Sequence, residues 1–226
     1  MTIIGTVQHV LVGKIKPFAR GESSAINKQP INGPVLVTLT GVTGDEQADK
    51  RFHGGEGKAL HLYPFEHYQQ WQNELGHLDA LNSAGAFGEN LSTLGITEDT
   101  ICLNDKIKIG STLLQFSEGR MPCWKLNERF SVSDMALRVQ MTQRCGWYFR
   151  VLETGTITAG DKIELLERPN PDWPFSRLLT LIYGGVLDKQ QLIQARQVPI
   201  ENDWQKIIEH RIETGHVEEW SSRLFG

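Results

Sequence analysis

The first two-thirds of the chain consists of short β-type segments separated by turn residues, and this pattern limits the fold more than any other feature. Asn104-Asp105 and Gly110-Ser111 are turn signals that separate some of the segments. The segments contain β-branched or alternating apolar residues and cover residues 4–13, 35–40, 58–62, 106–109, 112–117, 147–152 and 162–167. Many short strands at such spacing predict a barrel or a tightly curled mixed sheet.

Helices are predicted to interrupt this β-rich part. Residues 64–75 place their aromatic side chains along one stripe, and Pro64 suits the first helical position. Two shorter helices are predicted over residues 123–130 and 133–143.

The sequence pattern changes at residues 168–174, where three prolines form a stiff linker. Three helices are predicted beyond it, over residues 175–183, 188–197 with Asp188 as N-cap, and 201–213. We therefore expect a mainly β fold with α elements. A β-barrel-like domain with interspersed helices would cover residues 1–168, and a linker with a small three-helix bundle would cover residues 169–226. So small a bundle has a marginal core of its own, so it is expected to pack on the barrel.

Charge, leader pattern and cysteine count exclude several classes of protein. The formal net charge of −4 at pH 7 argues against a nucleic-acid partner. Polar residues interrupt the apolar stretch of the first 20 residues, so neither a signal peptide nor a membrane span is predicted. Cys102, Cys123 and Cys145 lie far apart, which favours free thiols in a reducing cytoplasm. They are too few for an iron–sulfur cluster held by four cysteines, and no G-x-G-x-x-G follows a strand.

A first cluster of basic residues and glycines follows Gly44 and contains Arg51, His53, Gly54, Gly55, Lys58 and His61. Paired glycines let backbone N–H groups approach a ligand closely, and Arg51 can bind a phosphate with two hydrogen bonds. The segment therefore predicts an anion site, and a solvated glycine-rich turn is the alternative. A P-loop is excluded because Phe52 and Ala59 stand where that motif needs Gly and Ser or Thr.

A second cluster surrounds Cys123. Pro122 fixes the backbone before it, a helix is predicted to begin there, and Arg120 and Lys125 are close in sequence. These neighbours favour a thiolate, which can attack a substrate, carry sulfur or ligate a soft metal. A buried structural cysteine is the alternative, and it is the preferred interpretation for Cys102 and Cys145.

Other candidate residues carry weaker signals. His67 and His77 are expected to be surface or core-edge histidines, and Tyr148 is expected to pack in the core. Gly88-Glu89-Asn90 precedes a strand, where these residues either hydrogen-bond a heterocycle or fix a turn.

Several of these motifs, taken in order, resemble the MOSC family, the domain found at the C-terminus of molybdenum cofactor sulfurases. The similarity extends over nearly the whole chain, and the tail is similar to the three-helix appendage of the YiiM-like subfamily. It rests on Gly44-Asp45, Gln47-Ala48-Asp49, His53-Gly54-Gly55, Tyr63-Pro64, 85–91, Arg120-x-Pro122-Cys123, 146–152 and Gly160-Asp161. One departure is Glu118-Gly119, where family members often have Gln-Pro, and this difference concerns the shape of the loop.

The resemblance implies a MOSC β-barrel and a molybdenum cofactor, with Cys123 as the molybdenum ligand. It also implies a detoxifying reductase of N-hydroxylated compounds such as base analogues, with His53 or His61 as proton relay. Residues expected to hold the pterin and its phosphate are Arg51, His53, Gly54, Gly55, Lys58, His61, Asn90, Arg120 and Lys125. The expected partners are a small N-hydroxylated substrate and a separate electron-donating reductase, and the tail allows a homodimer.

Two other functions are open at this point. Cys123 could carry a persulfide and pass its sulfur to a cofactor or metal centre. The chain could also bind the molybdenum cofactor and deliver it to other enzymes without catalysis of its own.

Overall fold

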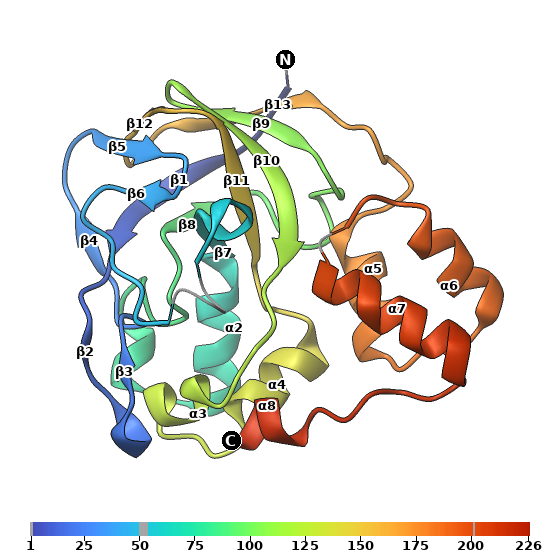
Figure 1. Ribbon diagram of the computed structural model, residues 1–226. Coiled ribbons are helices and arrows are strands. Elements are labelled where there is room, and N and C mark those ends of the chain that lie inside the picture. The colour runs from blue at the N-terminus through green and yellow to red at the C-terminus, as the bar shows by residue number, and fades with distance from the viewer. Residues whose placement is uncertain (1, 50–53, 201) are drawn as a thin grey trace.

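A closed β-barrel forms the body of the molecule (Figure 1). The computed structural model describes residues 2–49, 54–200 and 202–226, and within these ranges seven strands make up the barrel. Around the barrel they are β13 (Lys162–Glu167), β9 (Lys106–Ile109), β10 (Thr112–Gly119), β11 (Trp147–Glu153), β7 (Leu60–Pro64), β8 (Leu91–Leu94) and β1 (Thr2–Val12). Closure occurs because the long strand β1 pairs with β8 on one side and β13 on the other. The predicted barrel is confirmed.

One pair of barrel strands, β7 and β8, is parallel, and the other pairs are antiparallel. Parallel neighbours need a crossover connection, and here it contains helix α2 (Glu66–Leu75). Pro64 is the last residue of β7, and α2 begins at Glu66, so the prediction that Pro64 opens the helix is wrong. The predicted helix 64–75 is otherwise confirmed.

Short strands that the sequence pattern did not predict lie outside the barrel. They pair over two or three residues, too few for a visible alternation of apolar and polar positions. They are β2 (Lys16–Pro17), β3 (Ser23–Ser24), β4 (Gln29–Ile31), β6 (Gly41–Val42) and β12 (Gly155–Ile157), and the predicted β5 (Val35–Thr38) pairs with β6 and β12. Single 3-10 turns occur at Ala19–Gly21, Glu56–Lys58 and Asp79–Leu81.

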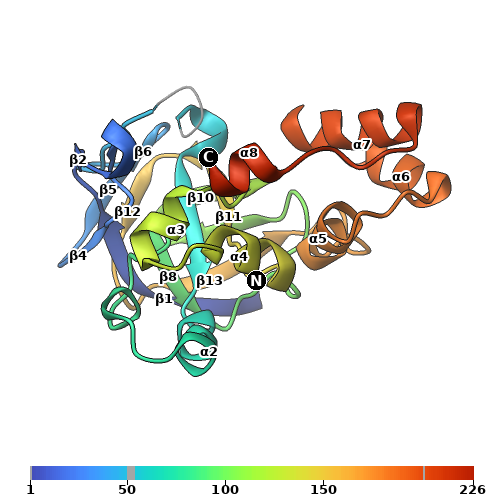
Figure 2. The same ribbon diagram turned by 90° about the horizontal axis from the view of Figure 1, so that it is seen from below.

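Helices gather at one end of the barrel and beside it (Figures 1 and 2). They are α3 (Lys125–Phe130), α4 (Met135–Thr142), α5 (Phe175–Tyr183), α6 (Lys189–Arg196), α7 (Asn202–Thr214) and α8 (Ser221–Phe225). The predicted cap is confirmed, because Asp188 Oδ1 accepts the amide of Gln191 at 2.9 Å. Helix α8 was not predicted, since Leu224 is its one buried residue and gives no periodic signal. In the described residues no helix has the length and apolar character to cross a membrane.

The tail helices share one apolar core with the barrel. Phe175 of α5 packs against Phe116 of β10 at 5.2 Å and Trp147 of β11 at 6.2 Å between ring centroids. Trp204 of α7 lies over Gly119, the last residue of β10, and donates its indole N–H to the Gly119 carbonyl at 3.3 Å. The tail is therefore docked on the strand that leads to Cys123.

A glycine is required at position 119 by this docking. A Cβ there would lie 2.4 Å from Phe175 Cζ and 2.7 Å from Trp204 Cζ2, distances at which atoms overlap. The glycine at position 119 thus has a physical reason in the packing of the tail.

We expect Gly119→Ala to lower the free energy of unfolding by about 1–3 kcal/mol, the usual cost of overpacking a core. Urea denaturation would measure the change. The matched comparison is Phe175→Leu, which makes room for the new methyl group. Its cost should be smaller in the Gly119→Ala background than in the wild type, and simple additivity of the two costs would contradict the predicted clash.

Candidate functional site

One pocket brings together residues from both predicted clusters. Cys123 lines it, as do Lys58, His61, Asn90, Arg120 and Lys125 of the predicted site. The other lining residues were not among the predicted site residues, and they are Ser24, Ala25, Ile26, Lys28, Glu46, Gln47, Ala48, Asp49, Phe87, Gly88 and Tyr148. Four of the lining side chains are Lys or Arg and two are carboxylates, so the surface suits an anionic ligand.

Cys123 is a half-buried free thiol between the end of β10 and the start of α3. Its carbonyl accepts the amide of Leu126 at 2.9 Å, which forms the turn that enters the helix. The helix begins at Lys125, two residues later than predicted. A cysteine here can react or bind a metal, whereas Cys102 and Cys145 are buried, as expected for structural thiols.

Two buried nitrogens of the pocket have no hydrogen-bond partner among the described residues: His61 Nε2 and Arg120 Nη1. Both side chains are more than nine-tenths buried. A buried polar atom without a partner is costly, so these two atoms indicate where a polar ligand would bind.

His61 is neutral in the ligand-free protein. Burial lowers the pKa of its imidazole to about 3, and the positive charge of Arg120 contributes in the same direction. The ring lies 5.0 Å from that of Tyr148, measured between centroids. Burial also raises the pKa of the Tyr148 phenol to about 12. Tyr148 was expected to be a core residue, but it is partly exposed and lines the pocket.

A buried carboxylate, Asp45, ties the walls of the pocket together. It accepts the Gly13 amide at 2.7 Å, the Asn90 Nδ2 at 2.9 Å and the ammonium of Lys28. Burial lowers the pKa of Lys28, and the charge of Asp45 opposes that effect. Asn90 also accepts the His61 amide at 3.2 Å and donates to the Leu11 carbonyl at 3.2 Å. Both the oxygen and the nitrogen of its side-chain amide are thus hydrogen-bonded within the protein.

Glu89 fixes the loop that carries Phe87 and Gly88 into the pocket. Its carboxylate accepts the Gly85 amide at 2.7 Å, the Phe87 amide at 3.1 Å and the Tyr68 hydroxyl at 2.6 Å. Burial raises the pKa of this carboxyl. The geometry matches the alternative in which this segment fixes a turn.

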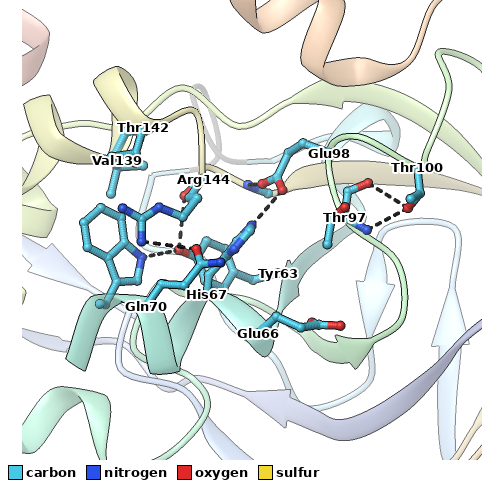
Figure 3. A network of polar contacts seen from close by, with 12 residues as sticks. Tyr63, Glu66, His67, Gln70, Thr97, Glu98, Thr100, Val139, Thr142 and Arg144 are labelled. Atoms are coloured by element: carbon cyan, nitrogen blue, oxygen red, sulfur yellow. Dashed lines mark hydrogen bonds and ion pairs between the residues drawn. The ribbon is translucent and has the colours of Figure 1, made fainter. Parts of the chain in front are cut away.

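A polar network that includes His67, Glu98 and Arg144 (Figure 3) is connected through Gly146 to the backbone of Arg120. His67 of α2 lies 2.7 Å from Glu98 Oε2, and Glu98 Oε1 accepts the Gly146 amide at 2.9 Å. The Gly146 carbonyl in turn accepts the amide of Arg120 at 3.2 Å. His67 was expected at the surface or core edge, but it is buried. Its role is structural, because it contacts Glu98, which in turn holds the Gly146 amide next to Arg120.

A hydroxyl bridge in the same network holds the 144–146 loop against α2. The Tyr63 hydroxyl accepts Trp71 Nε1 at 2.7 Å and donates to the Arg144 carbonyl at 3.1 Å. The Arg144 guanidinium stacks 3.8 Å from the centroid of Trp71 and binds Glu74 at 2.6 Å. These contacts fix the backbone from which β11 and Tyr148 begin.

Two lysines of the pocket are held by carboxylates. Lys125 pairs with Glu22 at 2.8 Å, and Lys58 pairs with Glu118 at 3.5 Å. Both pairs join the pocket to neighbouring segments, and both lysines line the same pocket as Cys123.

The remaining predicted residues lie elsewhere or outside the described ranges. Gly54 and Gly55 line a second hollow, which shares Glu46 and Gln47 with the main pocket. Arg51 and His53 lie outside the described residues. Their predicted roles stay predictions.

These residues fit an anionic organic ligand that carries a soft metal. His61 Nε2 and Arg120 Nη1 can bond such a ligand, the positive charge of Arg120 attracts it, and Cys123 offers one sulfur donor. A pterin cofactor with a phosphate and a molybdenum atom meets this description.

Several known proteins are similar to this chain in sequence, in fold or in both. The MOSC domain family model matches residues 49–164. Protein YiiM of Escherichia coli (strain K12) is 36% identical over 96% of this chain and 97% of its own length. The crystal structure of YiiM from Escherichia coli superposes with a TM-score of 0.81 at 30% identity, covering 98% of this chain and 99% of that one. A protein named Reductase from Gibberella moniliformis (strain M3125 / FGSC 7600) is 42% identical over 87% of this chain, which spans 33% of that protein.

The lowered pKa of His61 predicts how stability depends on pH. Between pH 6.5 and about 3 the unfolded chain binds a proton at residue 61 that the folded protein does not. Folding stability is therefore lost as pH falls below 6.5, with a contribution of up to about 1.4 kcal/mol per pH unit. Urea unfolding at pH 4, 5, 6 and 7 should show a shallower pH dependence in His61→Gln than in the wild type. Parallel curves for the two proteins would contradict the prediction.

Proposed function

This chain belongs to the MOSC domain family, and from that membership and the pocket we propose that it is a molybdenum-cofactor-dependent reductase of N-hydroxylated compounds. The observation that carries the proposal is the grouping in one pocket of Cys123 with two buried nitrogens that have no hydrogen-bond partner among the described residues. The relative named Reductase supports an oxidoreductase over a carrier of sulfur or cofactor.

In this proposal the chain's own residues bind and orient the cofactor. Cys123 is the metal ligand, Arg120 and His61 bond the pterin or its phosphate, and Lys28, Lys58 and Lys125 form part of the wall around it. When bound, the cofactor supplies a two-electron centre that can remove an oxygen atom from an N-hydroxyl group.

The overall reaction consumes protons as well as electrons. An N-hydroxylated amine, two electrons and two protons give the amine and water. His61 is the proposed relay, and this role depends on a bound anion raising its pKa, because an imidazole with a pKa of about 3 is too weak a base to accept a proton at neutral pH. Tyr148, with its raised pKa, keeps its proton and can donate a hydrogen bond to a bound group.

Electrons are proposed to come from a separate reductase, because the sequence has no dinucleotide motif and too few cysteines for its own iron–sulfur cluster. The similar fungal Reductase is about three times as long as the aligned region. Its additional length has room for an electron-donating part, which this chain would obtain from another protein.

We expect near-stoichiometric molybdenum per mole of wild-type protein made in a host that synthesises the cofactor, and almost none in Cys123→Ser, because the metal loses its thiolate ligand. Elemental analysis would measure it. Cys102→Ser, which alters a buried thiol away from the pocket, is the matched control and should retain the metal.

The same measurement separates the alternatives. Equal molybdenum in wild type and Cys123→Ser would remove Cys123 as the ligand. No molybdenum or pterin, together with a mass increase of about 32 Da on Cys123, would favour the persulfide carrier.

We also expect the purified protein to reduce an N-hydroxylated base analogue with a chemically reduced artificial donor and to be inactive with NADPH alone. Product amine, quantified by chromatography, is the readout. Sustained turnover with NADPH as the sole reductant would show that the chain accepts electrons from a nicotinamide directly, against the partner part of the proposal. Metal-loaded protein that is inactive with every donor would favour a cofactor delivery protein.

A further inference from the structure

Both peptide groups that flank Cys123 are bonded to a single residue 100 positions later, Arg223. The Arg223 guanidinium Nη1 donates to the carbonyl of Pro122, and the Arg223 carbonyl accepts the amide of Trp124 at 2.8 Å. Arg223 Nη2 also donates to Gln140 Oε1 of α4 at 2.6 Å. One residue of α8 therefore fixes the backbone on each side of the reactive thiol.

Neighbouring contacts hold the rest of α8 against the same loop. Asn127 Nδ2 donates to the Leu224 carbonyl at 2.8 Å, and the Leu224 side chain is buried. From the other side, Arg20 donates to the Phe225 carbonyl at 2.7 Å and stacks 4.5 Å from the centroid of Trp124. A helix of five residues is not stable alone, so α8 owes its position to these contacts.

Residues 215–226, here termed the C-terminal strap, connect α7 to this loop. Figure 2 shows the strap leaving the tail helices and ending in α8, which lies beside α3 and α4. Along it, Arg223 stacks 4.5 Å from the Trp220 centroid, and Trp220 packs on Tyr183 of α5 at 6.1 Å. Arg211 of α7 binds Glu218 at 2.5 Å. The strap thus links the tail to the site.

We propose that Arg223 is a positioning residue for Cys123, and that the strap completes the site by holding residues 122–124 in one conformation. Arg223 bonds to peptide groups beside the cysteine, so it acts through the backbone. This inference rests on the proposed function only in taking Cys123 as the reactive centre.

The first test is the alkylation of Cys123 by iodoacetamide in the metal-free protein, followed by peptide mass spectrometry from pH 6 to 10. The plateau rate at high pH is compared, because every accessible thiol is then ionised and the rate reports access and mobility. Arg223→Gln should raise this plateau rate by about fivefold or more, since the loop opens more often. Arg223→Lys keeps the charge and one donor, and it should recover most of the protection.

The matched control is Arg177→Gln, which removes another arginine of the tail. Arg177 stacks 4.1 Å from Trp173 and bonds to Asp172, away from the cysteine loop. Its plateau rate should equal that of the wild type. A folded Arg223→Gln protein with a plateau rate within about twofold of the wild-type value would overturn the proposal.

The second test needs no variant, so it holds even if Arg223→Gln fails to fold. In wild-type protein, hydrogen exchange of the Trp124 amide and of the α8 amides should have the same free energy of opening, because they open together. A Trp124 amide protected at least about tenfold more strongly than α8 would show that the loop is held without the strap.

Molybdenum content of the same variants separates this inference from the proposed function. With metal in the wild type, Arg223→Gln should lose metal and Arg223→Lys should regain part of it. If the wild type binds no metal, the proposed function fails, while the alkylation and exchange results still decide the role of Arg223.

Discussion

The carboxylate of Asp45 is the contact on which the pocket depends. It joins the end of β1, the segment before β4 and the residue that precedes β8, through Gly13, Lys28 and Asn90. Burying a charge is costly unless it is paired and hydrogen-bonded, and three donors meet that need here. Because Asn90 passes the connection to the backbone of His61, the basic wall and the histidine are placed by the same ion pair. On this side the walls of the pocket are therefore joined by contacts within the protein itself.

The opposite side of the pocket is supported differently, by aromatic packing and by the tail. Gly119 admits Trp204 and Phe175 at the end of β10, directly before Arg120. The Arg120 amide is bonded to the Gly146 carbonyl, and the Gly146 amide is bonded to Glu98. Cys123 lies between these two supports and the last helix. A tail that looks like a separate bundle in the sequence is thus part of the structure that surrounds the thiol.

Much of the fold could be predicted from the sequence, because the barrel strands carry β-branched residues at strand spacing and most helices have a clear apolar stripe. Pro64 was misplaced because a proline suits both the end of a strand and the start of a helix. Helix α8 buries only Leu224, so no periodic pattern marks it.

The sequence predicted which of its reactive and basic residues would come together, although their roles stay predictions. Cys123, Arg120, Lys125, Lys58, His61 and Asn90 do line one pocket. Lys28 and Tyr148 were missed for physical reasons. Lys28 stands in an ordinary polar segment, and only the fold places it beside Asp45. Tyr148 has strand-like apolar neighbours, so its partial exposure to the pocket depends on barrel curvature. Likewise, nothing in the sequence relates Arg223 to a cysteine 100 residues away.

The pairing of β1 with β13 has a consequence for how the protein is made. The first and last barrel strands are separated by some 150 residues of chain, so the barrel cannot close on the ribosome until β13 has emerged. Contacts between such distant segments fold slowly, since a long loop must be ordered before they form. Helix α8, whose Arg223 bonds to the peptide groups on both sides of Cys123, is synthesised later still. During synthesis the thiol is therefore present, and open to oxidation, before its final surroundings exist.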